Sequence, residues 1–270
     1  MNGVIVVDKE KGKTSFDEIR KIRKEFNIKK VGHIGTLDPM ATGVLPILVG
    51  EATKLSDYLM EHDKEYVATL TLGEKRDTGD SEGIVVETKE IPNVNEIELK
   101  NVLKSFKGEI SQIPPIYSAI KVNGKKLYEY AREGKQVEIK PRIVTIYDIK
   151  LIEIKENNIT FKVHCSKGTY IRTLCEDIAK KLGTVGYMSS LRRTRVGNFT
   201  LEDVGRIISI EEVLKDNQEY KLNDNELNKL LNGVKIITDL KDGLVRIYNN
   251  EKFIGVGEVK NKVLKRKIII

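Results

Sequence analysis

The order of apolar and polar residues divides the start of the chain into a short strand and a helix. The run Gly3–Asp8 is almost wholly apolar, which is typical of a short buried strand. After a turn around Gly12, Thr14 is suited to be a helix N-cap, with Asp17 three residues later. The helix is expected to bury the face formed by Ile19, Ile22 and Phe26.

Further along the chain, two segments have the composition and spacing of strands. Glu65–Gly73 alternates apolar and polar residues, and Gly83–Thr88 is expected to be its strand partner across an acidic loop. The other expected elements are helices near Glu51–Met60 and Ile97–Phe106, strands near Thr145–Ile154 and Ile159–Cys165, and a helix after Gly168 that carries Ile171, Leu174, Ile178 and Leu182. Strands and helices are thus mixed without the regular alternation of a parallel α/β fold.

Two segments differ in pattern from the rest. Ser118–Gly134 contains Asn123-Gly124 between short apolar-polar runs, which is the strongest short-range signal for a β-hairpin, so a projecting hairpin is expected there. From about Asn223 the pattern changes to short strands separated by turn signals. We therefore expect two domains, 1–222 and 223–270, the second a small all-β unit with little core of its own.

Charge is unevenly distributed along the chain. The formal net charge is +7 and the pI about 9.1, which favours a polyanionic partner. Arg76–Glu98 has seven acids against two bases, whereas Ser118–Arg142, Ser166–Arg195 and Lys252–Lys267 are basic. Clustered Lys and Arg are what a phosphate-binding face requires. The alternative, separately solvated faces on unrelated sides, stays open on charge alone.

Other features exclude some classes of protein. No segment approaches the roughly 18 consecutive apolar residues of a membrane span, and the start of the chain does not resemble a signal peptide, so a cytoplasmic protein is expected. The two cysteines and three histidines show no Cys-x-x-Cys or His-x-x-x-His spacing. This spacing disfavours a structural zinc site.

The segment Gly32–Pro46 (GHIGTLDPMATGVLP) is the best candidate for chemistry. Its glycines do not match the spacing of nucleotide-binding loops. Asp38-Pro39 has a structural interpretation, because Asp is a preferred N-cap and Pro suits the first position of a helix. In the functional interpretation, the glycines shape a rigid loop that presents the Asp38 carboxylate as a nucleophile or base.

Arg172 is a second candidate because of its expected place in a helix. If Thr169 caps the helix after Gly168, Arg172 lies in the first turn, where the helix dipole disfavours a cation. An anion such as Asp38 or an RNA phosphate would suit its guanidinium. A surface arginine that tilts into solvent is the alternative.

Aromatic residues give weaker signals. Tyr66 shares a strand face with Ala68 and Leu70, so periodicity favours a core aromatic, although its ring would also suit stacking on a base. His33 has no partner pattern. Tyrosines interleave with basic residues between 117 and 132, which fits either nucleic-acid contact or an ordinary amphipathic surface.

Together these segments resemble the TruB family of tRNA pseudouridine synthases over essentially the whole chain. The blocks that carry the resemblance are NGVIVVDK, GHIGTLDPMATGVLP, KEYVATLTLG followed by DTGD, IPPIYSAIKVNGKKLYEYAREG, HCSKGTYIRTL and LRRTRVGNF, with FIGVGEV similar to the PUA RNA-binding domain. The family's usual Asp-Lys-Pro is Asp8-Lys9-Glu10 here, which affects the expected turn rather than the chemistry.

The resemblance implies an α+β fold, with a mixed, largely antiparallel sheet flanked by helices and a C-terminal PUA barrel. It implies isomerisation of uridine 55 in the T-loop of tRNA to pseudouridine, without metal or organic cofactor, by a protein expected to be a monomer. By motif, Asp38, Tyr66 and Arg172 are the catalytic candidates, and residues 118–142 form an RNA-gripping thumb. The substrate-binding candidates are His33, Leu191, Tyr170, Lys9, Lys121, Lys125 and Lys126.

Two other functions are compatible with the same features. A non-catalytic tRNA-binding chaperone would use the same basic face. A guide-dependent rRNA pseudouridine synthase would share the aspartate motif but act only with a guide RNA.

Overall fold

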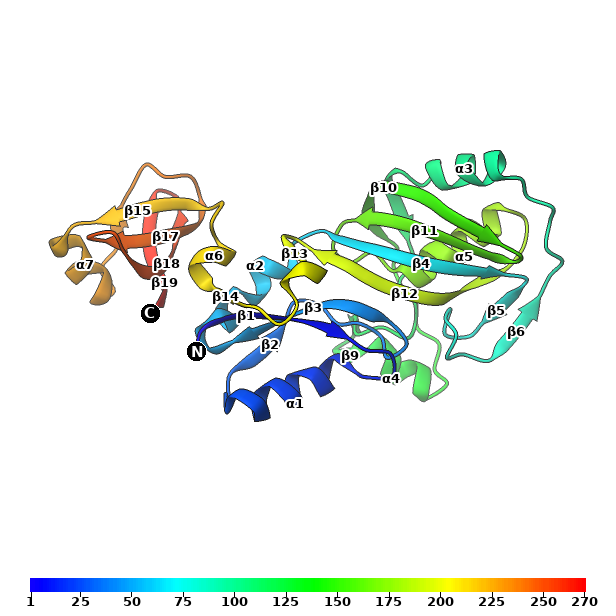
Figure 1. Ribbon diagram of the computed structural model, residues 1–270, viewed down its shortest axis with the longest axis horizontal. Helices are drawn as coiled ribbons and strands as arrows, with labels where there is room; N and C mark the ends of the chain where they lie inside the picture. The colour runs from blue at the N-terminus through cyan, green and yellow to red at the C-terminus, as the bar shows by residue number, and fades with distance from the viewer.

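A computed structural model describes residues 1–270, and a ten-stranded sheet extends through most of it (Figure 1). Its strands are β1 (Gly3–Lys9), β2 (Val31–His33), β3 (Thr42–Val49), β4 (Lys64–Leu72), β7 (Gly108–Gln112), β10 (Arg142–Lys155), β11 (Asn158–Cys165), β12 (Gly186–Val196), β13 (Phe199–Thr200) and β14 (Ile207–Ser209). The main order is β14-β1-β3-β12-β4-β11-β10-β7, with β2 paired to β3 and β13 to β12. Only β3 and β12 pair in parallel, so the mixed, largely antiparallel sheet is confirmed.

Helices flank this sheet, and most begin with a sequence-encoded cap. They are α1 (Ser15–Phe26), α2 (Ser56–Met60), α3 (Glu96–Lys104), α5 (Ile171–Lys181) and α6 (Ile210–Val213), with 3₁₀ helices η1 (Gly50–Leu55) and η2 (Leu201–Asp203). The expected capping of α1 is confirmed, because Thr14 and Asp17 form a reciprocal capping box. The single helix expected over Glu51–Met60 is instead η1 followed by the short α2.

Strands β1 and β3 are buried on both faces, which explains their continuous apolar sequences. Alternate residues of β1 join two different clusters: Val4 and Val6 pack with Leu48 on one face, whereas Ile5 packs with Ile22 of α1 on the other. Strand β3 was missing from the sequence prediction, because Pro46 in its middle argues against a central strand.

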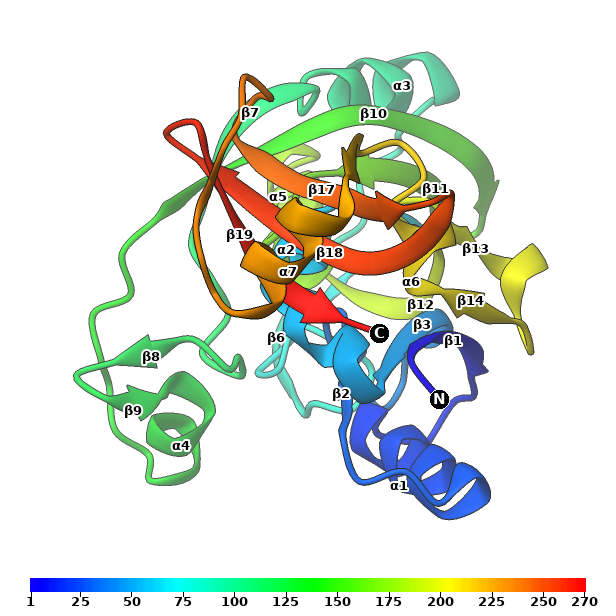
Figure 2. The same ribbon diagram turned by 90° about the vertical axis from the view of Figure 1, so that its left-hand side faces the viewer.

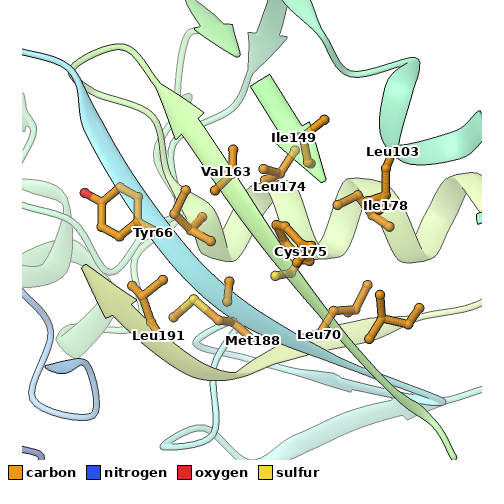
Figure 3. Packing of buried hydrophobic residues seen from close by; sticks show 14 of the residues in the cluster. Tyr66, Leu70, Leu103, Ile149, Val163, Leu174, Cys175, Ile178, Met188 and Leu191 are labelled. Carbon is orange, nitrogen blue, oxygen red and sulfur yellow. The ribbon is translucent and has the colours of Figure 1, made fainter. Parts of the chain in front are cut away.

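The other half of the sheet is covered by α5. Ala68 and Leu70 of β4 lie in the largest apolar cluster together with Leu174 and Ile178 of α5, and Figure 3 shows Leu70, Leu174 and Ile178 in it. Tyr66 lies at the edge of this cluster (Figure 3). The strand's period of two therefore places Tyr66 on the core face, as the sequence predicted.

A second sheet forms the C-terminal unit at one end of the molecule (Figure 1). It contains β15 (Gln218–Leu222), β16 (Ile236–Ile237), β17 (Gly243–Asn249), β18 (Lys252–Lys260) and β19 (Val263–Ile269), with helix α7 (Asp224–Leu231). The small C-terminal β-sheet domain expected from the sequence is therefore confirmed; its sheet begins at Gln218, and it includes one short helix, α7. Leu244, Val256 and Ile268 share an apolar cluster with Leu55 and Leu59, so the two sheets are joined by a hydrophobic contact.

Two small hairpins project from the main sheet. They are β5 (Glu74–Arg76) with β6 (Val85–Thr88), and β8 (Lys121–Val122) with β9 (Lys125–Lys126), the second followed by α4 (Leu127–Arg132). The prediction that Gly83–Thr88 pairs with Glu65–Gly73 is wrong, because β6 pairs with β5. The Asn123-Gly124 hairpin is confirmed, with φ of 51° and 81° at the two turn residues. It extends away from the body of the protein (Figure 2).

The two halves of the main sheet meet where β3 approaches β12. Only two residue pairs, Arg192 with Thr42 and Arg193 with Gly43, join these strands. Gly43 has φ of 106°, and a Cβ placed on it would lie 2.1 Å from the Arg193 carbonyl oxygen. A side chain at Gly43 would therefore push the strands apart.

The helices of this protein are all too short or too polar to cross a membrane.

We expect Gly43→Ala to lower the free energy of unfolding by at least about 3 kcal/mol, because it combines backbone strain with a steric overlap. Gly183→Ala is the matched control, since Gly183 has φ of 85° but no atom within 4 Å of a Cβ. The control should cost only about 1 to 2 kcal/mol, the strain alone. Urea denaturation measures both values, and equal losses would refute the close-approach argument.

Candidate active site

Asp38 lies in the loop between β2 and β3 and begins a tight turn. The Ala41 amide donates to the Asp38 carbonyl at 3.0 Å, and Pro39 occupies the second position of the turn, which suits its fixed φ. The turn does not continue into a helix, so the structural interpretation of Asp38-Pro39 as a helix start is wrong. The Asp38 side chain is half-buried, with 39% of its surface exposed.

Arg172 pairs with Asp38 from the first turn of α5. Its Nε lies 3.2 Å from Asp38 Oδ2, and its side chain is only 8% exposed. Thr169 does not cap α5, since its hydroxyl donates to the Ser166 carbonyl. The side-chain amide of Gln112 instead bonds both backbone groups of Tyr170, at the start of the helix. The expected position of Arg172 against the helix dipole therefore holds, although the expected cap does not.

The same guanidinium reaches two other segments. Nη1 donates to the Thr78 carbonyl at 3.1 Å and lies 3.6 Å from Asp80 Oδ2, and Nη2 donates to the Tyr117 carbonyl at 2.9 Å. Asp80 was not singled out from the sequence, and its side chain is 5% exposed. Arg172 thus connects Asp38 to the acidic loop and to the residue that precedes the thumb.

The surroundings of Asp38 perturb its ionisation. Burial raises the pKa of Asp38, Arg172 acts against this rise, and the nearby carboxylate of Asp80 adds to it. A carboxylate with a raised pKa and a close cation is typical of functional sites.

A pocket of about 130 Å³ opens beside the Asp38 carboxylate. Its walls include Asp38, Tyr66, Tyr170, Arg172, Met188 and Leu191. Tyr66, Met188 and Leu191 lie close together on the neighbouring strands β4 and β12 (Figure 3). Tyr66 is therefore both a core residue and a pocket residue, and burial raises the pKa of its phenol. The structure thus brings together five of the predicted site residues: Asp38, Tyr66, Tyr170, Arg172 and Leu191.

Arg193 supports the loop that presents Asp38 and was not singled out from the sequence. The residue is 1% exposed, and its guanidinium donates to the carbonyls of Val44 (2.8 Å), Thr36 (3.3 Å) and Gly35 (3.2 Å). These carbonyls flank Asp38 on both sides in the chain. The only sequence signal was a run of arginines in LRRTR, which does not indicate which one turns inward.

Lys9 is placed differently from its prediction as a substrate-binding residue. It is 0% exposed, and its ammonium group donates to the carbonyls of Glu10, Lys13 and Pro39. The cation has no surface available to RNA. We therefore correct this prediction: Lys9 supports the turn that begins at Asp38.

The remaining predicted contacts lie outside the pocket. His33 is half-buried on β2, its Nδ1 has no hydrogen-bond partner, and burial lowers its pKa. Lys121, Lys125 and Lys126 lie on the projecting hairpin, where Lys125 pairs with Glu133. The structure does not bring these four residues to Asp38.

Known proteins share both the sequence and the fold. Residues 23–171 match the TruB family pseudouridylate synthase N-terminal domain, residues 172–237 the tRNA pseudouridylate synthase B C-terminal domain, and residues 219–267 the C-terminal domain of pseudouridine synthase II TruB. The tRNA pseudouridine synthase B of Francisella philomiragia is 44% identical, over 99% of this chain and 94% of its own. That of Francisella tularensis subsp. novicida is 43% identical over the same shares.

Solved structures with the same fold come from larger assemblies. A chain of a Cbf5-Nop10-Gar1 complex has a TM-score of 0.70 and 28% identity, covering 95% of this chain and 78% of that one. A chain of an H/ACA RNP bound to a substrate RNA containing 2′-deoxyuridine has a TM-score of 0.68 and 26% identity, covering 95% and 77%. The N-terminal domain match spans more than half of this chain, and the curated relatives match almost its whole length. This chain therefore belongs to the TruB family of pseudouridylate synthases and is an RNA-modifying isomerase.

Proposed function

We propose that this protein converts uridine 55 in the T-loop of tRNA to pseudouridine, with Asp38 as the catalytic carboxylate. The observation that carries the proposal is the ion pair between Asp38 and Arg172 at the wall of a small, partly apolar pocket. The relatives named as tRNA pseudouridine synthase B support tRNA as the substrate. They match this chain far better than the H/ACA proteins do.

The pocket suits a single nucleobase that has left its stack. Removing a base from its stack costs a few kcal/mol, and stacking on an aromatic ring recovers roughly 1 to 3 kcal/mol per base. Tyr66 supplies the ring, and Met188 and Leu191 supply apolar walls. The side chains of these three residues therefore favour a flat base over a charged ligand.

Pseudouridine formation requires one bond to break and another to form. The N1–C1′ bond of uridine breaks, the uracil turns, C5 bonds to C1′, and the C5 proton leaves while N1 gains one. Asp38 is the carboxylate in the pocket that can act as nucleophile or base in this sequence. Arg172 keeps that carboxylate ionised and oriented. We predict that these residues carry out the reaction without a metal or organic cofactor.

The T-arm is the proposed contact beyond the pocket. The thumb at 118–142 carries Lys121, Lys125 and Lys126 on a hairpin that extends from the body, and His33 lies on β2 before the catalytic loop. The C-terminal unit adds the basic segment Lys252–Lys267. We further propose that the protein acts as a monomer, because one chain contains every group that the site uses. We also propose that it acts in the cytoplasm.

We expect Asp38→Asn to abolish product formation while tRNA binding is retained, because the amide keeps the shape of the side chain but is neither base nor nucleophile. Tritium release from tRNA labelled at uridine C5 should fall by about 10²- to 10⁴-fold or more. Asp57→Asn is the control, since Asp57 is exposed on α2. Loss of binding together with activity, or a substituted enzyme as active as wild type, would contradict the role of Asp38.

The purified protein should modify an unmodified tRNA transcript without any added RNA. Because a guide-dependent enzyme would give no product and a chaperone would bind without releasing tritium, this assay separates the three functions. Primer extension after chemical modification of pseudouridine should stop at position 55 and nowhere else. A product at another position would refute the proposed target, though not the reaction.

Activity should fall as the solution is acidified, because Asp38 must be ionised and its pKa is raised by burial. The ionised form is present above this pKa and lost as pH falls through it. Since the Asp80 charge also raises the pKa of Asp38, Asp80→Asn should move the acidic limb of kcat/KM to lower pH. Asp57→Asn should leave the limb in place, and a shift toward higher pH in Asp80→Asn would count against this electrostatic account.

A further inference from the structure

Helix α1 exposes an aromatic ring and three cations on its outer surface. Phe16 is 54% exposed, and Arg20, Arg23 and Lys24 are also exposed. Ser15, Glu18, Ile19 and Ile22 face the protein instead. This α1 face (Phe16, Arg20, Arg23 and Lys24) carries three cations, and the one carboxylate beside it is Asp17, which caps the helix and pairs with Arg20.

The cations of the α1 face are largely free of carboxylate partners. Arg23 and Lys24 form no salt bridge within 4.0 Å. Arg20 pairs only with Asp17, while its guanidinium remains 64% exposed and lies over the Phe16 ring at 5.1 Å. An exposed pair of this kind contributes little to stability and is easily exchanged for a stronger anion.

The helix turns this face toward the thumb. Lys21 and Glu25 line a groove with Val204 and Ile207 on the β14 side of α1. Since residues advance by about 100° around a helix, Phe16 and Arg23 lie on the opposite flank, the side of β2. Helix α1 and the β8–β9 hairpin with α4 lie on the same side of the molecule in both views, with β2 between them in the second (Figures 1 and 2).

The same helix is attached to the catalytic loop. The Ser15 hydroxyl accepts from the Leu37 amide at 2.8 Å and donates to the Leu37 carbonyl at 3.2 Å, one residue before Asp38. From that point α1 extends for about 18 Å, the length of twelve helical residues. A strand of RNA that leaves the pocket in this direction would pass along the α1 face.

We propose that the α1 face is a second RNA-binding surface, on the same side of the molecule as the thumb and separated from it by β2, that holds the RNA chain flanking the flipped uridine. Arg20, Arg23 and Lys24 contact backbone phosphates, and Phe16 stacks on an unpaired base. Charge complementarity supports this occupant, since the face has a net positive charge and phosphates are anionic. The inference rests on the proposed function, because it takes the substrate to be an RNA.

The test is the triple substitution R20A/R23A/K24A, in which alanine preserves the helix. The Kd for an unmodified tRNA transcript at about 0.1 M salt should rise about 10-fold or more. The slope of log Kd against log salt should become shallower by about 2 to 3, because each lost phosphate contact removes roughly one. Single-turnover rates at saturating enzyme should stay within about two-fold of wild type, since the pocket is unaltered.

Two further variants make the test specific. K100A/K104A/K155A removes three exposed lysines of α3 and β10, and α3 lies on the far side of the molecule from α1 (Figures 1 and 2). This control should change the Kd and the slope far less than the α1 triple. Phe16→Ala should raise the Kd about 5-fold or more without changing the slope, because it removes stacking but no charge.

A Kd and slope in R20A/R23A/K24A equal to those of the lysine control would overturn the proposal. The result is distinguishable from failure of the proposed function. If wild type bound no tRNA or released no tritium, the function would fail before any variant was compared. If wild type bound tRNA normally and R20A/R23A/K24A had the same Kd and slope as the lysine control, only the proposal about the α1 face would be refuted.

Discussion

Arg193 carries a positive charge into the middle of the sheet, where it is 1% exposed and donates three hydrogen bonds to backbone carbonyls. Burying a cation without a carboxylate costs several kcal/mol, so these bonds must be well formed to offset the cost. They tie Gly35, Thr36 and Val44 to β12 and thereby fix both ends of the loop that presents Asp38. Because the main chain of Arg193 also abuts Gly43, one residue sets the strand register and the loop shape together.

The site lies where two differently packed halves of the sheet meet. On one side β1 and β3 are buried on both faces, and on the other β4 and β12 are covered by α5. Asp38 comes from the first half, and Tyr66, Arg172 and Leu191 come from the second. Neither half contains the site alone, which is why the narrow contact between β3 and β12 matters for the chemistry as well as for folding.

Patterns local in sequence predicted most of the fold, whereas long-range features were missed. The α1 capping box, the period of β4 and the Asn123-Gly124 hairpin depend on neighbouring residues and were confirmed. Strand β3 was missed because Pro46 in its middle is unusual for a central strand. The predicted partner of β6 was wrong because strand pairing is not determined by the local sequence. The helix dipole indicated that Arg172 requires an anion, with Asp38 or an RNA phosphate as candidates, and the structure shows Asp38 as its partner. Asp80, Arg193 and the burial of Lys9 gave no local signal.

The bond between Arg172 and the Tyr117 carbonyl has a thermodynamic consequence. Tyr117 is the last residue before the thumb, so a thumb movement that displaces it removes an acceptor from the guanidinium that also holds Asp38. The position of the thumb and the protonation of Asp38 are then linked equilibria, and linkage is reciprocal. If RNA binding moves the thumb in this way, the free energy that couples the two events changes the affinity for RNA and the proton affinity of Asp38 equally, so proton uptake or release on binding would measure it.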